Sequence, residues 1–411
     1  MKAKKRSVRR RSYRKHLVIL AVLLIIGMIC GMKFLIDSRK EDDIMQVEPS
    51  KTEQKEEQIN NLVLEMLKRM SLEQKVGQML VIRNLNTEMT PELEEDLMAL
   101  QPGGYIVFNE NITTLAGTKQ FIDDSREVIE QAGTVAMDDE TIVKIPVLMS
   151  VDQEGGLVQR LQAITDETPE YVPAMAEIGA SGSLDKAYEV GRLLAEECKS
   201  VGLNVDFAPV VDIFSNPENT VIGERSFGSD KDTVAKMAVR VAQGLSDGGV
   251  VPVYKHFPGH GDTVADSHFA LPVVSKSLEE LEQNELYPFR KAIEAGAEMM
   301  MVAHIALPNI TGDNTPASLS PMIISEVLRG RLGCKGIVVT DGLDMGALTE
   351  NYSNAEIAVK AVEAGADLLL TPVSPLEARD AILTAVRDGV LSEERIDESV
   401  GRILRMKLGK L

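Results

Sequence analysis

Tryptophan is absent from the 411-residue chain, aromatic residues make up 4% of it, and cysteine occurs three times. Cys30 lies in an N-terminal apolar segment, whereas Cys198 and Cys334 have the apolar surroundings typical of small core residues. These cysteines provide neither a disulfide framework nor a C-x-x-C metal spacing. The chain must therefore depend on a large apolar core, which about 350 residues can supply.

Positive charge is concentrated at the N-terminus and is scarce elsewhere. Residues 1–16 hold nine Lys/Arg and no acidic residue, but from residue 37 onward 34 Lys/Arg stand against 63 Asp/Glu. Such an acidic surface disfavours nucleic acid and other anionic polymers as ligands. We therefore expect no nucleic-acid partner and a neutral or cationic substrate.

One long apolar run follows the basic tail. Residues 17–32 are uncharged, and the run continues to residue 36 past Lys33, which gives about 20 residues, enough to cross a bilayer. The basic flank predicts a single-pass cell-membrane protein, anchored in the membrane through residues 17–36, with the rest of the chain extracellular. Two alternatives stay open: a cleaved signal peptide, although no A-x-A-like site is evident, and lipidation of Cys30.

The remaining chain divides by composition into a linker and one domain. Residues 37–60 are polar and acidic, which predicts a flexible linker. Residues 61–411 contain eight short apolar runs, of the kind expected for parallel strands covered on both faces. The runs lie at 77–82, 104–108, 146–151, 203–208, 250–255, 299–304, 336–340 and 367–371. The predicted organisation is a cytoplasmic tail (1–16), an anchor (17–36), a linker (37–60) and this domain (61–411).

Segments with helical periodicity follow these runs. Leu184, Ala187, Val190, Leu194 and Cys198 recur every three or four positions, which indicates a helix over 184–201. Pro288 is predicted to split a helical segment at 277–296, and a last helix at 393–408 to close the fold. The predicted fold class is therefore α/β, a single (β/α)₈ TIM-type barrel behind the transmembrane anchor. An open doubly wound sheet is the alternative, but no G-x-G-x-x-G follows the first run.

Polar residues gather where the predicted strands end, which is where barrel active sites lie. They are Asp152, Lys255, His256, His304 and Asp341, with Arg160 and Arg225 on the loops that follow the third and fourth strands. Four of the five histidines fall on the fifth strand, its loop or the sixth strand. A zinc site is an alternative, but these histidines lack spacings such as H-x₃-H. We therefore expect neither a metal nor a cofactor.

These residue types suit glycoside cleavage. A retaining glycosidase needs a carboxylate nucleophile and an acid/base group on opposite sides of the scissile bond. Asp341 directly follows an apolar strand and suits the first role, although an Asp there also caps helices. His268 suits the second role, because an imidazole exchanges protons near neutral pH and Asp266, two residues before it, can fix its tautomer. A simple turn is the alternative for this pair.

Five motifs together resemble glycoside hydrolase family 3, in its β-N-acetylhexosaminidase branch. They are VDQEGGLVQR (151–160), GERSFGSD (223–230), KHFPGHGDTVADSH (255–268), MVAH (301–304) and VVTDGLDM (338–345). The resemblance implies that Asp341 is the nucleophile and that Asp266 and His268 form the acid/base dyad. It implies that Asp152, Arg160, Arg225, Lys255 and His256 bind the sugar, with Glu154 and His304 nearby.

The implied reaction is the hydrolysis of terminal non-reducing β-N-acetylglucosamine, from peptidoglycan-derived or related oligosaccharides, through a covalent glycosyl-enzyme. A β-N-acetylglucosaminide phosphorylase using the same residues is the alternative, because a histidine acid/base does not repel phosphate. A non-catalytic wall-binding module is a third possible function. The presence of Asp341, Asp266 and His268 disfavours it, because such a module would not need them. The Gly-rich loop around His268 further predicts that this residue lies far from Asp341 when no substrate is bound.

Overall fold

The computed structural model describes Met28, Met32 and residues 50–411, except residues 139, 168, 264, 265, 268 and 269. The predicted tail (1–16) and the predicted linker up to residue 49 lie outside the described residues. The same holds for the predicted anchor (17–36), apart from the two methionines. The fold below is that of the compact unit Glu56–Leu411.

Eight parallel strands form a nearly closed barrel, in the order β11-β10-β9-β8-β5-β2-β1-β12. The first and last strands pair with each other, with Leu80 opposite Leu369. Between β11 and β12 the only recorded bridge in the described chain joins Val339 to Leu368. The strands are β1 (Leu80–Ile82), β2 (Gly104–Ile106), β5 (Leu148–Val151), β8 (Val205–Asp206), β9 (Val251–Phe257), β10 (Met299–Val302), β11 (Ile337–Thr340) and β12 (Leu369–Leu370).

Seven of the eight strands lie inside one of the apolar runs in the sequence, and β9 begins inside its run but extends two residues beyond it, to Phe257. Every residue of these strands is buried, because the barrel interior covers one face and helices cover the other. The prediction of an α/β fold with an eight-stranded parallel barrel of the TIM type is therefore confirmed.

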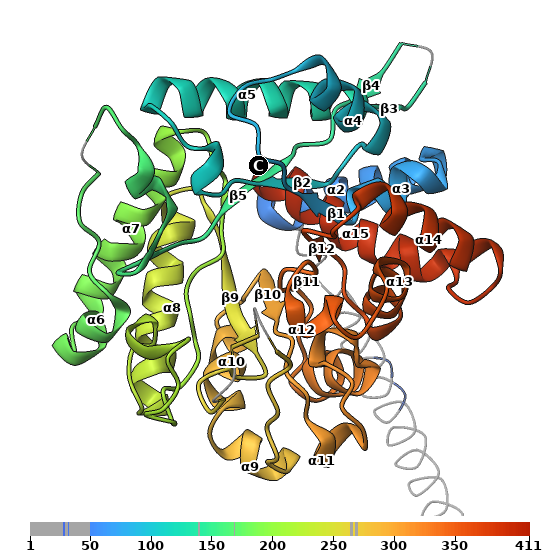
Figure 1. The fold of residues 1–411 in the computed structure, drawn as a ribbon. Helices are drawn as coiled ribbons and strands as arrows, with labels where there is room; N and C mark the ends of the chain where they lie inside the picture. Colours follow the sequence, from blue (N-terminus) through green and yellow to red (C-terminus); the bar gives the residue numbers. More distant parts are fainter. Residues whose placement is uncertain are drawn as a thin grey trace, which may run out of the picture. The chain divides into compact units, whose positions relative to one another are not determined.

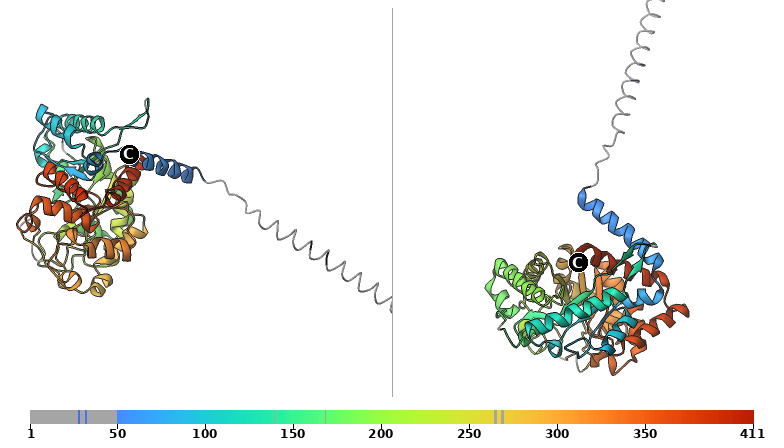
Figure 2. Two further views of the ribbon diagram at one scale, coloured as in Figure 1. Left: turned by 90° about the vertical axis from the view of Figure 1, so that its right-hand side faces the viewer. Right: turned by 90° about the horizontal axis from the view of Figure 1, so that it is seen from above.

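Helices surround the strands (Figures 1 and 2). Most long ones begin at a Ser, Thr or Asp whose side chain accepts a hydrogen bond from the first turn, as Ser183 does for α7 and Asp230 for α8. The longer helices are α2 (Lys51–Arg69), α4 (Pro91–Leu100), α5 (Leu115–Ala132), α7 (Leu184–Ser200), α8 (Lys231–Asp247), α10 (Leu286–Glu294), α13 (Asn354–Ala364), α14 (Pro375–Arg387) and α15 (Glu393–Lys410).

Shorter elements lie between these helices and the strands. The short helices are α3 (Leu72–Gln78), α6 (Met175–Ser181), α9 (Leu278–Gln283), α11 (Pro308–Thr311) and α12 (Gly346–Thr349), and residues Met322–Arg331 form a π-helical segment. Two small antiparallel pairs join β3 (Val135–Ala136) to β4 (Ile142–Val143) and β6 (Gln153–Gly155) to β7 (Val158–Gln159). The second pair follows β5 and carries part of the pocket described below.

Two sequence-based boundaries need correction. The segment 277–296 does split, but at Asn284 and Glu285, and Pro288 lies in the first turn of α10. Proline is tolerated there because the first turn needs no internal N–H donor. The linker predicted over 37–60 overlaps helix α2. Ser50 and Glu53 exchange reciprocal hydrogen bonds that start this helix at Lys51, which an acidic composition alone did not reveal.

The membrane prediction is also corrected. In the described part of the chain, no helix is both long and apolar enough to cross a membrane. The long described helices carry charged residues along their length, as in the sequence KTEQKEEQINNLVLEMLKR of α2. The expectation of a single-pass cell-membrane protein anchored through residues 17–36 conflicts with this finding, which covers only Met28 and Met32 of that segment, and it is not retained below.

Candidate active site

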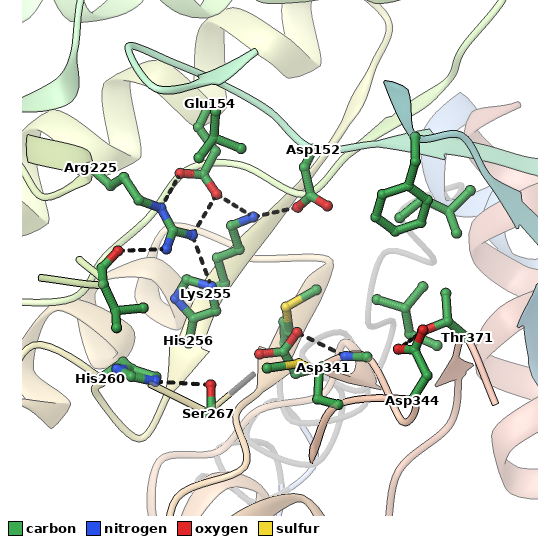
Figure 3. A pocket seen from close by; sticks show the side chains of 18 of the residues that line it. Asp152, Glu154, Arg225, Lys255, His256, His260, Ser267, Asp341, Asp344 and Thr371 are labelled. Carbon is green, nitrogen blue, oxygen red and sulfur yellow. Dashed lines mark hydrogen bonds and ion pairs between the residues drawn. The ribbon is translucent and has the colours of Figure 1, made fainter. Parts of the chain in front are cut away.

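A pocket of about 380 Å³ opens at the carboxyl ends of the barrel strands. A set of charged side chains lies on one side of it, Asp341 lies below them, and Asp344 with Thr371 lies on the other side (Figure 3). The structure thus brings together six of the eight residues that the sequence singled out: Asp152, Arg160, Arg225, Lys255, His256 and Asp341.

The charged side chains form a continuous network. The Nζ atom of Lys255 lies 2.6 Å from Oδ1 of Asp152 and 2.6 Å from Oε1 of Glu154. Arg225 grips the same Glu154 carboxylate with two donors, Nε at 2.7 Å and Nη2 at 2.8 Å. Glu154 and Lys255 are each only 2% exposed, so these charges interact with little screening by water. Glu154, which the resemblance had given a minor place, joins the two cations.

Mutual stabilisation shifts the pKa values within this network. Burial alone would raise the pKa of Glu154, but the charges of Arg225 and Lys255 outweigh it and hold that pKa well below its ordinary value. Burial would likewise lower the pKa of Lys255, but Asp152 and Glu154 raise it above its ordinary value. Glu154 and Lys255 therefore stay charged near neutral pH, as an acceptor and a donor for polar ligand groups.

His256 is oriented by a buried carboxylate that the sequence analysis missed. Its Nδ1 atom lies 2.7 Å from Oδ2 of Asp212, and its backbone N–H donates to the same carboxylate. Its Nε2 atom lies 3.4 Å from Nη2 of Arg225, which can only donate. Asp212 thus fixes the tautomer with the proton on Nδ1. Burial would raise the pKa of Asp212, but His256 and His260 bring it below its ordinary value.

Asp341 directly follows β11, and its backbone ties it to the neighbouring strand. Its N–H donates to the carbonyl oxygen of Val302 at 2.9 Å, and the N–H of Gly342 donates to its Oδ1 at 2.8 Å. Burial alone would raise the pKa of Asp341, but His256, His304 and the Gly342 N–H lower it below its ordinary value. The pocket therefore holds an ionised carboxylate with one oxygen anchored.

His304 supports this loop and does not line the pocket. Its side chain is fully buried, and Nε2 donates to the carbonyl oxygen of Gly342 at 2.8 Å. Its Nδ1 atom lies 2.7 Å from Oγ of Ser318. A carbonyl only accepts, so the Nε2 proton is fixed and His304 holds the residue after Asp341 in place.

Arg160 lies on the opposite wall, beside an aromatic ring. Its guanidinium carbon lies 5.7 Å from the ring centre of Phe108, and that of Arg83 lies 5.1 Å from the same ring. The Nε atom of Arg160 is buried and has no hydrogen-bond partner among the described residues. A buried donor left in this state costs free energy, so it is suited to an acceptor on a ligand.

The acid/base pair predicted from the sequence is only partly within the described chain. His268 lies outside the described residues. Its expected position far from Asp341 therefore stays a prediction. The carbonyl oxygen of Asp266 accepts a hydrogen bond from Ala270. Ser267, between the two members of the pair, lines the pocket.

The loop that carries this pair is held at its first residues. His260 donates its N–H to Asp212 at 2.6 Å, and its ring lies 2.9 Å from Oγ1 of Thr263 and 3.2 Å from Oγ of Ser267. Asn219 donates to the His260 carbonyl oxygen at 2.8 Å. Burial lowers the pKa of His260, so its ring is a neutral hydrogen-bonding group.

Several pocket residues were missed because no local motif marks them. Arg83, Phe108 and Thr371 each follow a short strand by one or two residues, so their position after a strand was the available signal. Asp344 lies in the motif VVTDGLDM but was assigned no role, and Asp212 is buried behind His256 and does not line the pocket. Among the described residues no group of three or more His, Cys, Asp or Glu is placed to hold a metal ion.

A family model described as the glycosyl hydrolase family 3 N terminal domain matches residues 71–406. The chain is 31% identical over 345 residues to Beta-hexosaminidase A of Pseudoalteromonas piscicida, covering 78% of this chain and 56% of the relative. It is 33% identical over 319 residues to a Beta-hexosaminidase of Hydrogenovibrio crunogenus, covering 76% of this chain and 83% of the relative. The resemblance drawn from the motifs is confirmed.

Among solved structures, the chain is similar to a glycoside hydrolase family 3 β-N-acetylglucosaminidase from Paenibacillus sp. str. FPU-7. The TM-score is 0.76 at 39% identity, over 83% of this chain and 63% of that one. The chain thus spans less than two thirds of the length of this structure and of the Pseudoalteromonas relative.

Proposed function

The chain belongs to glycosyl hydrolase family 3, and on that premise we propose that it is a retaining exo-β-N-acetylglucosaminidase. It would release terminal non-reducing β-N-acetylglucosamine from peptidoglycan-derived or related oligosaccharides. Residues 61–411 would form the catalytic barrel. The observation that carries this proposal is the ionised, anchored carboxylate of Asp341 facing the network of Asp152, Lys255 and Arg225.

In this proposal Asp341 attacks the anomeric carbon and forms a covalent glycosyl-enzyme, which water then hydrolyses. Its lowered pKa keeps it ionised near neutral pH, as a nucleophile requires. The Gly342 N–H holds Oδ1, which leaves Oδ2 to react. His268, oriented by Asp266, would protonate the leaving oxygen and then activate the water.

The network opposite Asp341 would bind the terminal sugar. Asp152 and Lys255 provide an acceptor and a donor for neighbouring hydroxyls. Arg160 and His256 would contribute donors and an acceptor, and the unpartnered Nε of Arg160 gives this residue a binding role. The pocket volume is near the lower end of the range of about 300–1,000 Å³ for small-molecule sites, which favours one terminal ring over an extended chain.

The substrate class follows from the relatives, whose names specify hexosaminidases. The test is hydrolysis of an aryl β-N-acetylglucosaminide beside the matching aryl β-glucoside by the full chain. We expect a clear preference for the acetamido sugar. Product analysis on muropeptides and on chitin oligosaccharides then identifies the natural leaving group. Equal rates on the two aryl glycosides would contradict the assignment.

Asp341→Asn tests the mechanism. We expect kcat to fall by at least about 10³-fold, because the amide cannot form the covalent intermediate. Asp380→Asn, on an exposed ion pair of α14, is the matched control and should leave kcat unchanged. Wild-type turnover by Asp341→Asn, or by His268→Ala, would contradict the proposed roles.

Inorganic phosphate distinguishes hydrolysis from phosphorolysis. The free sugar should be the main product with and without phosphate. Formation of mainly sugar 1-phosphate would replace the hydrolase by the phosphorylase alternative.

A further inference from the structure

Three side chains meet on the pocket wall that carries Asp344 and Thr371 in Figure 3. Oδ2 of Asp344 pairs with Nη2 of Arg83 at 2.9 Å, and Oγ1 of Thr371 donates to Oδ1 of Asp344 at 2.9 Å. Both oxygens of Asp344 are thus engaged. Arg83 and Thr371 lie outside the five motifs, and Asp344 lies within VVTDGLDM (338–345) but was assigned no role. None of the three belongs to the proposed sugar-binding set.

The three residues follow three different strands at the seam of the barrel. Arg83 follows β1, Asp344 lies four residues after the end of β11, and Thr371 follows β12. At this seam β11 and β12 share one recorded bridge among the described residues, Val339–Leu368, with backbone hydrogen bonds such as that from the N–H of Thr340 to the carbonyl oxygen of Leu368 at 3.0 Å. Beyond that bridge, the N–H of Leu343 donates to the carbonyl oxygen of Leu370 at 2.9 Å. The side-chain contacts of Arg83, Asp344 and Thr371 add to this backbone connection where the loop after β11 begins.

Gly342 connects this cluster to Asp341. A Cβ atom on Gly342 would lie 2.9 Å from Oδ1 of Asp344 and 3.2 Å from Oγ1 of Thr371, so its Cα is tightly packed against both side chains. Its N–H donates to Asp341 and its carbonyl oxygen accepts from His304. All sides of Gly342 are therefore fixed, and a displacement of Asp344 would move the N–H that holds the Asp341 carboxylate.

The backbone of Thr371 gives independent support. Its φ is +45°, a left-handed conformation that a β-branched residue rarely adopts. Residues in such conformations persist where their surroundings hold them, and they cluster at functional sites. Here the N–H of Thr371 donates to the carbonyl oxygen of Val81 at 2.8 Å, which aims its hydroxyl at Asp344.

Arg83 is held from its other side as well. Its guanidinium carbon lies 5.1 Å from the ring centre of Phe108, so the cation contacts an aromatic ring while it pairs with Asp344. Its side chain is 43% exposed and that of Asp344 is 24% exposed. The ion pair by itself would contribute little to stability at such exposure, so a role in geometry explains its place better than a role in folding.

We propose that Arg83, Asp344 and Thr371 form a brace that positions Asp341 through Gly342. They are positioning residues for the nucleophile and make no contact with the reacting atoms in this scheme. The inference rests on the proposed function, because it assigns a purpose to the geometry of Asp341.

The test compares variants that remove one interaction each while preserving shape: Asp344→Asn, Arg83→Met and Thr371→Val. Thr371→Ser keeps the hydroxyl and is the conservative rescue of Thr371→Val. Asp380→Asn, on the exposed ion pair with Arg379, is the control for loss of a surface charge. Each variant of the full chain is assayed on an aryl β-N-acetylglucosaminide and on N,N′-diacetylchitobiose, whose leaving group is much poorer.

For the three brace variants we expect kcat to fall roughly 10- to 100-fold, the penalty typical of a misplaced reacting group. The fall should be similar for both substrates, because attack by Asp341 is impaired whatever the leaving group. KM should change less than threefold, because the charged network of Asp152, Lys255 and Arg225 lies on another wall. Mass spectrometry after rapid quenching should show slower accumulation of the glycosyl-enzyme, and Thr371→Ser should stay close to wild type.

Wild-type kcat in Asp344→Asn and Thr371→Val would overturn the proposal, and so would a loss confined to the poor leaving group or a rise in KM alone. A variant that merely unfolds is recognised by its melting temperature. If Asp344→Asn does not fold, the pair Thr371→Val and Thr371→Ser decides the matter. An inactive wild-type chain would refute the proposed function instead, whereas an active wild type beside unaffected brace variants refutes only this inference.

Discussion

A single residue, Glu154, joins Arg225 and Lys255, and its side chain is only 2% exposed, so water cannot readily replace these partners. We predict that Glu154→Gln lowers the free energy of unfolding by about 2–5 kcal/mol, because it leaves Arg225 without its buried counter-charge while Lys255 keeps Asp152. Urea denaturation at pH 7 measures this change. The matched control is Glu398→Gln on the exposed pair with Arg402, which should change stability by less than about 0.5 kcal/mol.

The pH dependence of the same difference has a defined sign. The pKa of Glu154 is lower in the folded chain than in the unfolded chain, so its stabilisation is complete above the unfolded value of about 4.3. It is lost as the pH falls through that value towards the folded pKa. The difference in unfolding free energy between wild type and Glu154→Gln should be constant from pH 5 to 8 and shrink below pH 4. A difference that grows on acidification would contradict the assignment.

At the scale of single residues, the sequence predicted the acids and bases that lie at or just after the ends of apolar strands, such as Asp152, Lys255 and Asp341. Their partners were harder to predict, because Glu154 meets Arg225 across 71 residues and Asp212 meets His256 across 44. These contacts depend on where each loop turns back over the barrel, which periodicity does not encode. The motif resemblance found Arg160 and Arg225, which lie on loops.

Among the structural elements, the loop after β9 packs closely against the segment that carries Asp212. A Cβ atom on Gly261 would lie 1.9 Å from the carbonyl oxygen of Ile213, the residue after Asp212. We predict that Gly261→Ala lowers kcat/KM by at least about tenfold, because the loop must move away from Asp212 and carries residues 266–268 with it. Overpacking of this kind should also cost about 1–3 kcal/mol of stability.

Steady-state kinetics and thermal unfolding together test this prediction. Gly409→Ala is the control, since the nearest atom to its new methyl group would be Cδ1 of Ile59 at 3.8 Å. It should preserve activity and slightly raise the melting temperature, because alanine favours the helical conformation of α15. Unchanged kcat/KM in Gly261→Ala would show that the loop can shift without disturbing the site.

The elements themselves were largely predictable. All eight strands could be found because they are buried on both faces and therefore read as continuous apolar runs. The predicted ends of two helices were wrong, because hydrogen bonds and turns at the helix ends determine where a helix starts and stops. Helix α9 ends at Gln283, so the break lies before Pro288 and is not caused by it. Helix α2 starts at a capping pair, Ser50 and Glu53, inside a segment whose acidic composition predicted a linker.

At the scale of the whole molecule, the last long helix ties the end of the chain to its first barrel elements through one buried cation. Nζ of Lys407, on α15, donates to Oε1 of Gln78 at 2.7 Å and to the carbonyl oxygen of Gly103 at 2.6 Å, and the side chain is fully buried. Gln78 ends α3, just before β1, and Gly103 precedes β2. This contact therefore lies at the amino ends of the strands, away from the pocket.

Burial lowers the pKa of Lys407 to about 7, because both partners are neutral. Between about pH 7 and the unfolded value near 10.4, the unfolded chain binds the proton more tightly, so stability should rise with pH across this window. The advantage of wild type over Lys407→Met should therefore increase by on the order of 2–3 kcal/mol from pH 7 to 9.5, measured by urea denaturation. Lys410→Met, at an exposed pair with Glu298, should show no such trend. A flat difference for Lys407→Met would mean that the amine stays protonated, and that the junction between the two ends of the barrel domain tolerates a buried charge.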